Sequence, residues 1–292
     1  MRLSGIMKRG QGAFEYVLLM AGVLLIVVLS VAVFRGLSGK SLVQIRENVE
    51  TVGRFVCYPL YLKEPSIGEI VWKMNENGGN ILHDETIPRI NGLLGDGEAS
   101  RMPTWRNTAE CKYPPCLRFD GLDDIVVSES SPNVSGANGF TYEFWVLFED
   151  MGSGHTAYIA NKVSTFNIFI RQTDIAITPQ GSVPAGVEFH FFPQGEALTV
   201  SDPETVYTLT PHHILVTYDA GTKTARLYID GRLIGEDTAS GTGAIVDTGT
   251  RLYVGGFPGL DLSVQGMIDE VRLLTRGVNE EEVQDLFQCT VT

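Results

Sequence analysis

The chain has 292 residues, with 22 Lys and Arg against 35 Asp and Glu, and this length allows one large or two small domains. Residues 1–40 contain five basic residues and one acid, so the remaining 252 carry 17 basic and 34 acidic side chains, a net charge of −17. Such an acidic body repels phosphate backbones, which argues against a nucleic-acid partner. A hydrophobic content of 43% excludes a wholly disordered chain.

Near the N-terminus, the 19 residues 16–34 carry no charge and are almost all apolar. At about 1.5 Å per residue, a helix of this length just spans a bilayer core of about 30 Å. Lys8 and Arg9 precede the run, so the positive-inside rule places the N-terminus in the cytoplasm. We therefore expect a single membrane helix with an extracytoplasmic body.

The residues before this run carry a more specific signal. Glu15 lies at the edge of the apolar segment, where a carboxylate beside hydrocarbon is costly unless it is paired. With Gln11 before it and Tyr16 after it, the pattern resembles a class III signal peptide, the leader of archaeal type IV pilin-like proteins. The resemblance implies that a prepilin-peptidase-type protease cuts between Gly10 and Gln11. It also implies that Glu15 pairs with a neighbouring subunit's N-terminal amine during assembly. The alternative is an ordinary N-terminal anchor.

The helix is expected to continue past residue 34, because apolar residues recur at three- and four-residue steps among polar ones up to residue 56. An extended amphipathic second half suits a pilin-like helix that bundles with other subunits, and a membrane-proximal stalk is the alternative. The predicted organisation is a leader at 1–10, a transmembrane and assembly helix with its stalk at 11–56, and a third region at 57–292.

This third region is predicted to be mostly β. Short runs rich in Val, Ile, Tyr, Phe and Thr alternate with turn residues, which favours a sandwich or jelly roll. Asp230 and Gly231 separate two runs and suit a two-residue type I′ turn. Asn279 and Glu282 have capping-box spacing, which predicts a short C-terminal helix ending at Gln288 or Cys289. The predicted strands cover 125–128, 140–147, 158–161, 167–171, 187–192, 214–218, 225–229 and 252–254.

Several of these segments resemble, in family order, the LamG-like jelly roll of the concanavalin A-like lectin/glucanase superfamily. The matching blocks are 117–126, 140–146, 213–219, 225–231 and 267–274, with a weaker first strand at 70–76. The resemblance covers about residues 68–288. It implies a sandwich of two antiparallel sheets, and it does not identify a ligand because fold alone does not give function.

The sequence gives little support for catalysis. Glycosidases of the wider superfamily place carboxylates at alternate positions of one strand, and no Glu-x-Asp-x-Glu run is present. Asp269 and Glu270 are adjacent, so on a strand they point to opposite faces. The five histidines show no zinc spacing. We therefore expect a binding domain and not an enzyme.

A structural calcium ion is suggested by the resemblance, since LamG-like domains often hold one with Asp and Asn side chains and backbone carbonyls. Calcium takes six to eight oxygen ligands. The alternative around residues 120–124 is turn chemistry, because Asp before Gly closes a turn without metal. The candidate ligands are Asn75, Asp84, Asp123, Asp124 and Asp269.

Aromatic side chains in loops are candidates for stacking on a sugar ring, whereas those inside predicted strands are expected in the core. The loop aromatics are Trp105, Tyr113, Phe192 and Phe257. Recognition is expected on long loops at one rim, at 93–116, 179–186 and 255–263.

Asn133 begins an Asn-Val-Ser glycosylation sequon in a Ser-, Pro- and Gly-rich stretch. On an extracytoplasmic protein it is a candidate glycan site, and an unmodified loop is the alternative.

All four cysteines follow the apolar run, and an even count in an extracytoplasmic region favours disulfides. Cys57 and Cys289 bracket the jelly roll, whose termini often lie close together, and Cys111 and Cys116 close a small loop containing two prolines. We expect the pairs Cys57–Cys289 and Cys111–Cys116, and a four-cysteine metal site is the alternative.

Together these features predict a pilin-like subunit held in the cell membrane by its N-terminal helix, with its body outside the cell or on a filament. The LamG-like domain would then mediate adhesion to a glycan or a surface protein. The alternatives are a membrane-anchored envelope protein that does not polymerise, and a structural decoration of a filament that binds no ligand.

Overall fold

The computed structural model describes residues 69–149, 155–172, 184–194, 196–207, 210–260 and 262–289. All of these belong to one compact unit within Pro59–Val291, and Met1–Tyr58 fall in a separate unit. Within the described part of the chain, no helix is long and apolar enough to cross a bilayer. The predicted membrane helix at 16–34 lies outside the described residues, as do Gly10, Gln11, Glu15 and Cys57.

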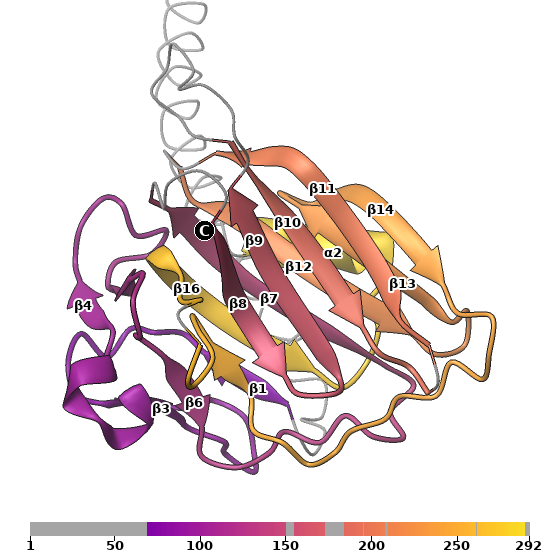
Figure 1. Cartoon of the computed structure of the whole chain (residues 1–292), viewed down its shortest axis with the longest axis horizontal. Helices are drawn as coiled ribbons and strands as arrows, with labels where there is room; N and C mark the ends of the chain where they lie inside the picture. Colours follow the sequence, from indigo (N-terminus) through magenta and orange to yellow (C-terminus); the bar gives the residue numbers. More distant parts are fainter. Residues whose placement is uncertain are drawn as a thin grey trace, which may run out of the picture. The chain divides into compact units, whose positions relative to one another are not determined.

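Two antiparallel sheets face each other and form the predicted jelly-roll sandwich (Figure 1). We call them sheet 1 and sheet 2. Sheet 1 has the order β14-β13-β12-β7-β16-β5-β4, with β1 also paired to β16, and sheet 2 has the order β11-β10-β9-β8-β15-β6-β3-β2. The strands of sheet 1 are β1 (Ile70–Trp72), β4 (Thr104–Arg106), β5 (Cys116–Asp120), β7 (Gly139–Phe148), β12 (His212–Asp219), β13 (Thr224–Ile229), β14 (Arg232–Thr238) and β16 (Gln265–Leu274).

Sheet 2 contains the strands that carry the site described below. Its members are β2 (Ile81–Leu82), β3 (Gly92–Leu94), β6 (Val126–Ser128), β8 (Thr156–Lys162), β9 (Phe166–Gln172), β10 (Pro184–Phe191), β11 (Leu198–Tyr207) and β15 (Tyr253–Val254). Two 3₁₀ turns, η1 (Gly95–Gly97) and η2 (Ala99–Arg101), lead from β3 toward β4.

Side chains alternate in direction along each strand, so every second residue points into the core between the sheets. Many of these inward residues are aromatic. Phe140 of β7 lies 5.2 Å from Phe166 and 5.1 Å from Phe191, measured between ring centroids. Tyr218 of β12 lies 4.3 Å from Phe191, and its hydroxyl donates to the Gly243 carbonyl at 2.6 Å. Each of these rings is fully buried, so strands of both sheets contribute to one continuous core.

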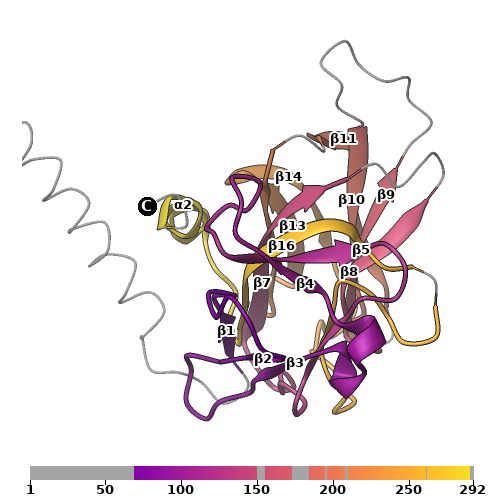
Figure 2. The same cartoon turned by 90° about the vertical axis from the view of Figure 1, so that its left-hand side faces the viewer.

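Sheet 1 is covered on its other side as well. The C-terminal helix α2 (Glu280–Cys289) packs Val283 and Leu286 against Leu215 of β12 and Tyr228 of β13. Figure 2 shows α2 on the side of the sandwich opposite β8 to β11. The central strands β7 and β12 of sheet 1 are therefore buried on both faces, and the outer face of sheet 2 is the one that α2 leaves uncovered.

Two local predictions are confirmed in detail. Asp230 and Gly231 have φ angles of 50° and 74°, the left-handed pair that a type I′ hairpin turn requires. At the start of α2, the Glu282 N–H donates to Asn279 Oδ1 at 2.9 Å, and the Asn279 N–H donates to Glu282 Oε2 at 3.0 Å. This reciprocal pair is the predicted capping box.

Candidate functional site

The outer face of sheet 2 is formed by residues that alternate with core residues along each strand. In β9, Asn167 and Phe169 are half-exposed, whereas Ile168 and Ile170, which alternate with them, are fully buried. In β10, Glu188 and His190 are half-exposed in the same way, each between buried neighbours. The pairing register brings these outward positions of neighbouring strands side by side.

Aromatic rings gather on this outer face. Tyr158 of β8 pairs in register with Phe169 of β9, and their ring centroids are 4.4 Å apart. Phe257, in the loop after β15, lies 6.0 Å from Tyr158 and 5.2 Å from Tyr253 of β15. His190 of β10 lies 5.1 Å from Phe169. We call these five half-exposed side chains, which come from the four strands β8, β9, β10 and β15 and from the loop after β15, the aromatic face.

A tight turn after β15 brings Phe257 to this face. Gly255 has a φ of 82°, and a Cβ at this position would lie 2.0 Å from an atom of the Phe119 ring in the core. Glycine is therefore needed for the chain to turn so close to the core. The turn places Phe257 next to Tyr253, which lies two residues before Gly255.

A pair of asparagines runs beside the rings. Asn161 of β8 is in register with Tyr253 on one side and with Asn167 on the other, and Asn167 is in register with His190. Asn161 Nδ2 donates a hydrogen bond to Asn167 Oδ1. Asn161 is only 6% exposed, and among the described residues its Oδ1 has no hydrogen-bond partner. A buried carbonyl without a donor is costly, and the half-exposed Asn167 is the member of the pair that a ligand in solution reaches.

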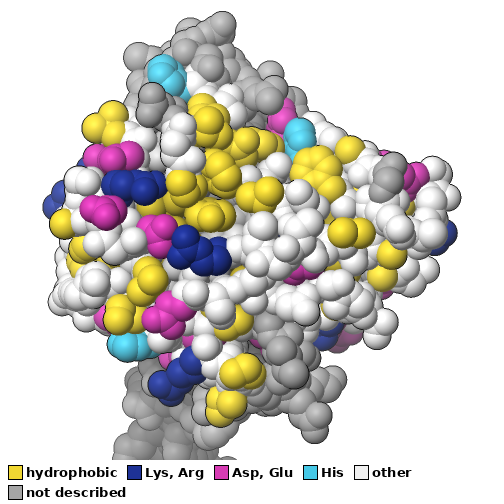
Figure 3. All heavy atoms as spheres, turned by 60° about the horizontal axis from the view of Figure 1, so that its bottom comes forward, with side chains coloured by type: hydrophobic (Ala, Val, Ile, Leu, Met, Phe, Trp, Pro, Cys, Tyr) yellow, Lys and Arg dark blue, Asp and Glu magenta, His cyan; other side chains and the backbone are white. Residues whose placement is uncertain are grey.

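The charged groups at the margins of the aromatic face are paired. His190 Nε2 lies 3.1 Å from Glu188 Oε2. At the other end, the Arg251 guanidinium lies 6.0 Å from the Tyr253 ring centroid and bonds both oxygens of Asp96, at 2.7 and 3.0 Å. Hydrogen bonding to Asp96 raises the pKa of Arg251, so this pair stays ionised. Figure 3 shows hydrophobic side chains gathered on one face of the molecule, with charged side chains mostly around them. The aromatic face thus presents aromatic rings beside the Asn161–Asn167 amide pair. The polar groups around it bond to each other, Glu188 to His190 and Arg251 to Asp96.

The four predicted stacking residues have different surroundings. Phe257 belongs to the aromatic face. Trp105 is half-exposed on β4 and donates from Nε1 to the Gly79 carbonyl at 3.0 Å. Tyr113 packs edge-on against Trp145 of sheet 1, with 6.4 Å between ring centroids. Phe192 lines a shallow depression of about 670 Å³ with Ser164, Pro193, Gln194, Glu196, Ala197 and Val246. Only one of the four therefore lies among other exposed rings.

The Cys111–Cys116 disulfide is confirmed, with 5.5 Å between the Cα atoms. The loop that it closes folds onto the outer face of sheet 1, where Lys112 Nζ lies 3.9 Å from the centroid of the Trp145 ring and the Tyr113 N–H donates to Asp269. Cys57 and the side chain of Cys289 lie outside what the structure describes, so the pair Cys57–Cys289 stays a prediction.

Two of the proposed calcium ligands are already occupied by protein hydrogen bonds. Asp84 is 1% exposed and accepts four bonds, from the N–H groups of Val71, Thr86 and Ile90 and from the Thr86 hydroxyl, at 2.7–2.9 Å. These bonds use the acceptor capacity of a carboxylate. Asp269 is 2% exposed and accepts backbone N–H bonds on both oxygens, and burial raises its pKa to about 8. Both oxygens of Asp269 therefore already have donors within the protein, which leaves few lone pairs for a calcium ion.

The remaining candidates lie in two places. Asn75 is exposed in the segment after β1. Asp123 is exposed in the turn after β5, and Asp124 is 5% exposed there and accepts from the Asp120 N–H at 2.9 Å. Asp120 Oδ1 accepts from the Leu122 N–H at 2.9 Å, which is the turn chemistry weighed as the alternative to metal. Within the described ranges, no three His, Cys, Asp or Glu side chains form a metal-binding group.

A buried charged cluster on sheet 1 is the arrangement that comes nearest to catalytic chemistry. Glu143 of β7 is fully buried, 2.7 Å from Arg272 Nη1 and 3.0 Å from His213 Nε2. Burial alone would raise the pKa of Glu143, but the charge of Arg272 and the bond to His213 hold it below its usual value. Arg272 also pairs with Glu270. Glu143, Arg272 and His213 are each under 5% exposed, so Glu143 is not presented to a substrate in solution.

The two-sheet architecture and the apolar outer face define a lectin-like jelly roll. Residues 120–284 match the family described as the concanavalin A-like lectin/glucanases superfamily, and the chain belongs to it. Residues 8–34 match the class III signal peptide. Both predicted resemblances are therefore confirmed. No curated protein matches this chain significantly.

Solved structures share the fold at low sequence identity. The binding domain of Paraclostridial Mosquitocidal Protein 1 is 16% identical, with a TM-score of 0.56 over 75% of this chain and 51% of that one. The binding domain of botulinum neurotoxin serotype D is 13% identical, with a TM-score of 0.55 over 75% and 51%. A structure of botulinum neurotoxin type C is 13% identical, with a TM-score of 0.54 over 76% and 50%. This chain spans about half the length of the structures it matches, and the likeness is one of fold.

Proposed function

We propose that this protein is a pilin-like cell-surface subunit whose jelly-roll domain binds an uncharged glycan through the aromatic face. The observation that carries the proposal is the group of half-exposed rings beside the Asn161–Asn167 pair. The apolar side of a pyranose ring stacks on an aromatic ring, and amides both donate to and accept from hydroxyl groups. A convergent set of a few polar groups on an apolar surface is typical of ligand sites.

The electrostatics favour a neutral ligand. The Arg251 guanidinium beside the face is paired with Asp96, Glu188 and His190 bond to each other, and the body as a whole is strongly acidic. An acidic glycan would be repelled by the body and would find no unpaired cation among the face residues described here. A neutral glycan rich in hydroxyl groups is not repelled by the acidic body and needs no cation on the protein.

Two further findings support the proposal. The class III signal peptide suggests export with an anchored or assembled N-terminus, which would place the domain outside the cell. Botulinum neurotoxin type C, which shares the fold, is described as dependent on interaction with two ganglioside molecules to enter cells, which supports glycan binding by this fold in general. The neutral class of the proposed glycan ligand rests on the aromatic face of this chain.

Glycan arrays probed with the full chain in mild detergent test the proposal. Tyr158→Ala and Phe169→Ala each remove one ring of the face, and a lost contact of about 1.4 kcal/mol weakens binding about tenfold. Phe192→Ala is the matched control, because it removes a half-exposed ring that lies outside the face. We expect the two face variants, shown to be folded by circular dichroism, to lose binding and the control to keep it. The opposite pattern would move the site to the depression beside Phe192.

Processing distinguishes a filament subunit from a permanently anchored envelope protein. We expect cleavage after Gly10, so that Gln11 is the first residue of the mature protein. The intact mass of the cell-surface protein tests this, and a mass that includes residues 1–10 would contradict it. Glu15→Ala should then block incorporation into filaments while cleavage continues. Normal incorporation of the variant would refute the proposed charge pairing.

A structural calcium ion remains a prediction, with Asn75, Asp123 and Asp124 as its remaining candidate ligands. Addition of Ca²⁺ to chelator-treated protein, followed by thermal unfolding, tests it, because a ligand that binds only the folded state raises Tm. An unchanged Tm at millimolar calcium would contradict the prediction.

A further inference from the structure

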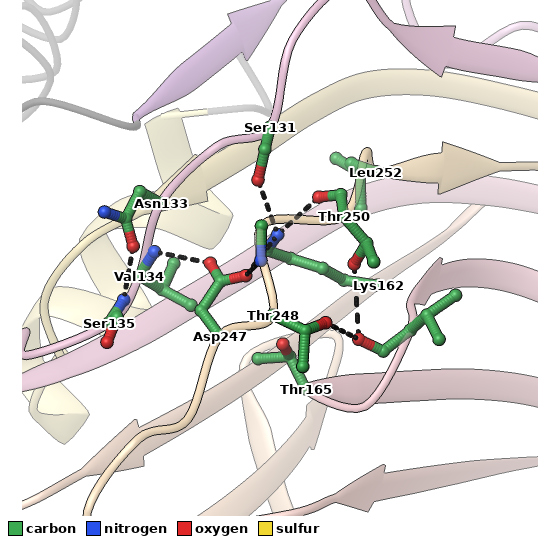
Figure 4. Close-up of polar contacts among 12 residues, drawn as sticks. Ser131, Asn133, Val134, Ser135, Lys162, Thr165, Asp247, Thr248, Thr250 and Leu252 are labelled. Carbon is green, nitrogen blue, oxygen red and sulfur yellow. Dashed lines mark hydrogen bonds and ion pairs between the residues drawn. The ribbon is translucent and has the colours of Figure 1, made fainter.

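The segment between β6 and β7 is held down at its centre by buried polar contacts. Val134 is fully buried, and its N–H donates to Asp247 Oδ2 at 3.0 Å. Asp247 also accepts from the Gly249 N–H at 2.9 Å and forms an ion pair with Lys162 at 2.9 Å. Lys162 Nζ donates onward to Ser131 Oγ at 3.1 Å, in the same segment as Val134. The segment is thus attached at two points to one buried ion pair (Figure 4).

The residues on either side of Val134 face the solvent. Asn133 and Ser135 are both exposed, and Asn133 Oδ1 accepts from the Ser135 N–H at 2.9 Å. Figure 4 shows the Asn133 amide nitrogen pointing away from Asp247 and Lys162. Open space surrounds the next turn, because a Cβ added at Gly136 would meet no atom within 4 Å. A bulky group on Asn133 Nδ2 would therefore project into solvent without disturbing the buried contacts.

Asn133-Val134-Ser135 is also the only Asn-x-Ser or Asn-x-Thr sequence in the 292 residues. We propose that Asn133 carries an asparagine-linked glycan. In this modification Nδ2 forms a bond to the anomeric carbon of a sugar that is activated on a phosphate leaving group. The bond from that carbon to the phosphate oxygen breaks, the leaving group departs with the bonding electrons, and Nδ2 loses one proton. This inference does not rest on the proposed glycan-binding function.

The buried Val134 sets the order of events. A transferase must hold the sequon in its own active site, and it cannot do so while Val134 is packed in the core and bonded to Asp247. Transfer must therefore precede docking of the segment onto the Lys162–Asp247 pair. Once docked, the segment holds the modified side chain outward.

Peptide mass spectrometry of the full chain purified from its native cells tests the proposal. We expect the peptide containing Asn133 to carry a glycan in the wild type and in Ser135→Thr, which keeps the hydroxyl. Asn133→Gln and Ser135→Ala should lose the glycan. Asn138→Gln is the matched control, because it alters another exposed asparagine of the same segment that begins no sequon, and it should leave the modification in place.

An unmodified Asn133 in the wild-type protein would overturn the proposal, as would a glycan that persists in Ser135→Ala. The order of events has a separate measurement. Asp247→Asn weakens docking of the segment, so we expect the modified fraction of the Asn133 peptide to stay equal to or rise above that of the wild type. A fall in that fraction would show that the transferase needs the docked conformation, which would refute the proposed order.

Discussion

The ion pair between Lys162 and Asp247 gives the sharpest stability prediction. Their side chains are 0% and 1% exposed, so removing one partner leaves a desolvated charge without compensation. Such a loss costs about 3–5 kcal/mol, a large part of a typical folding free energy of about 5–15 kcal/mol. We expect Lys162→Met, which retains the apolar stem, to destabilise the protein by about that amount. Asp247→Asn should cost a similar amount, because its Nδ2 cannot accept one of the two backbone N–H bonds.

The double variant Lys162→Met/Asp247→Asn removes both charges at once. We expect the double variant to lose less free energy of unfolding than the sum of the two single losses. The difference, which is the coupling energy, should be about 1–3 kcal/mol. Lys73→Met is the control, since the Lys73–Glu85 pair has the same chemistry at 2.8 Å with both side chains more than 40% exposed. Removing a surface pair of this kind costs about 0–1 kcal/mol.

Urea unfolding of the full chain in mild detergent, followed by tryptophan fluorescence, measures these differences. With a slope of about 3 kcal/mol/M, a loss of about 3 kcal/mol lowers the urea midpoint by about 1 M. If Lys162→Met lowered the midpoint no more than Lys73→Met does, the buried pair would not anchor the segment before β7. Strictly additive single and double variants would likewise refute the coupling.

Three further predictions concern other parts of the domain. The pKa of Glu143 is lowered in the folded state, so its pairing with Arg272 stabilises the protein above a pH of about 4.3 and this contribution is lost as the pH falls. Glu143→Gln should therefore lower the urea midpoint at pH 7 and flatten the acid limb of the stability curve, and an unchanged acid limb would contradict the assignment. Replacing both Cys111 and Cys116 by Ser should cost about 2 kcal/mol in the chain-entropy model for so short a loop, and equal unfolding of variant and wild type would refute this. Asn279→Ala removes the cap of α2 and should cost about 1 kcal/mol in thermal unfolding, whereas Asn279→Ser should recover most of it.

Features that depend on neighbouring residues in the chain could be predicted from the sequence. The Asp230–Gly231 turn, the capping box at Asn279 and the short Cys111–Cys116 disulfide each follow from residue types a few positions apart. The order of the family blocks further specified the jelly roll. Strand bounds agreed to within a few residues, although β11 was missed because its alternation includes Ser, Asp and Pro. The short strands β2, β3 and β4 were missed as well, and β4 lies within the segment 93–116 that was expected to be a loop.

The aromatic face could not be predicted, because it depends on how β8, β9, β10 and β15 pair with each other. Tyr158 and Phe169 lie in strands, and an aromatic residue in a strand is more often in the core. That expectation was correct for Trp72, Phe119 and Tyr218, which are fully buried between the sheets. Whether a strand residue faces inward or outward depends on its register relative to the partner strand, and a shift of one residue reverses it.

The same limit applies to the carboxylates. Asp84 and Asp269 were expected as calcium ligands because each lies in or near a segment that resembles the LamG-like family, whose members often hold calcium. Asp84 instead ties β1 to the segment before β3 through four hydrogen bonds, and Asp269 holds the disulfide loop through Tyr113. Each role depends on at least one residue 13 or more positions away in the chain, Val71 for Asp84 and Tyr113 for Asp269, so local composition did not reveal them.

The dependence of binding on salt separates the two kinds of ligand that the domain could meet outside the cell. A cationic surface protein would be attracted by the net charge of −17, and this attraction weakens as the Debye length falls from about 10 Å at 0.1 M salt to about 3 Å at 1 M. A neutral glycan on the aromatic face is held by ring stacking and by hydrogen bonds to the amides, which salt screens little. We therefore expect Kd to change by less than about twofold between 0.1 and 1 M NaCl, measured by calorimetry with a neutral oligosaccharide found on the arrays. A tenfold loss of affinity over the same range, or a Tyr158→Ala variant that binds the oligosaccharide as tightly as the wild type, would contradict recognition by ring stacking on the aromatic face.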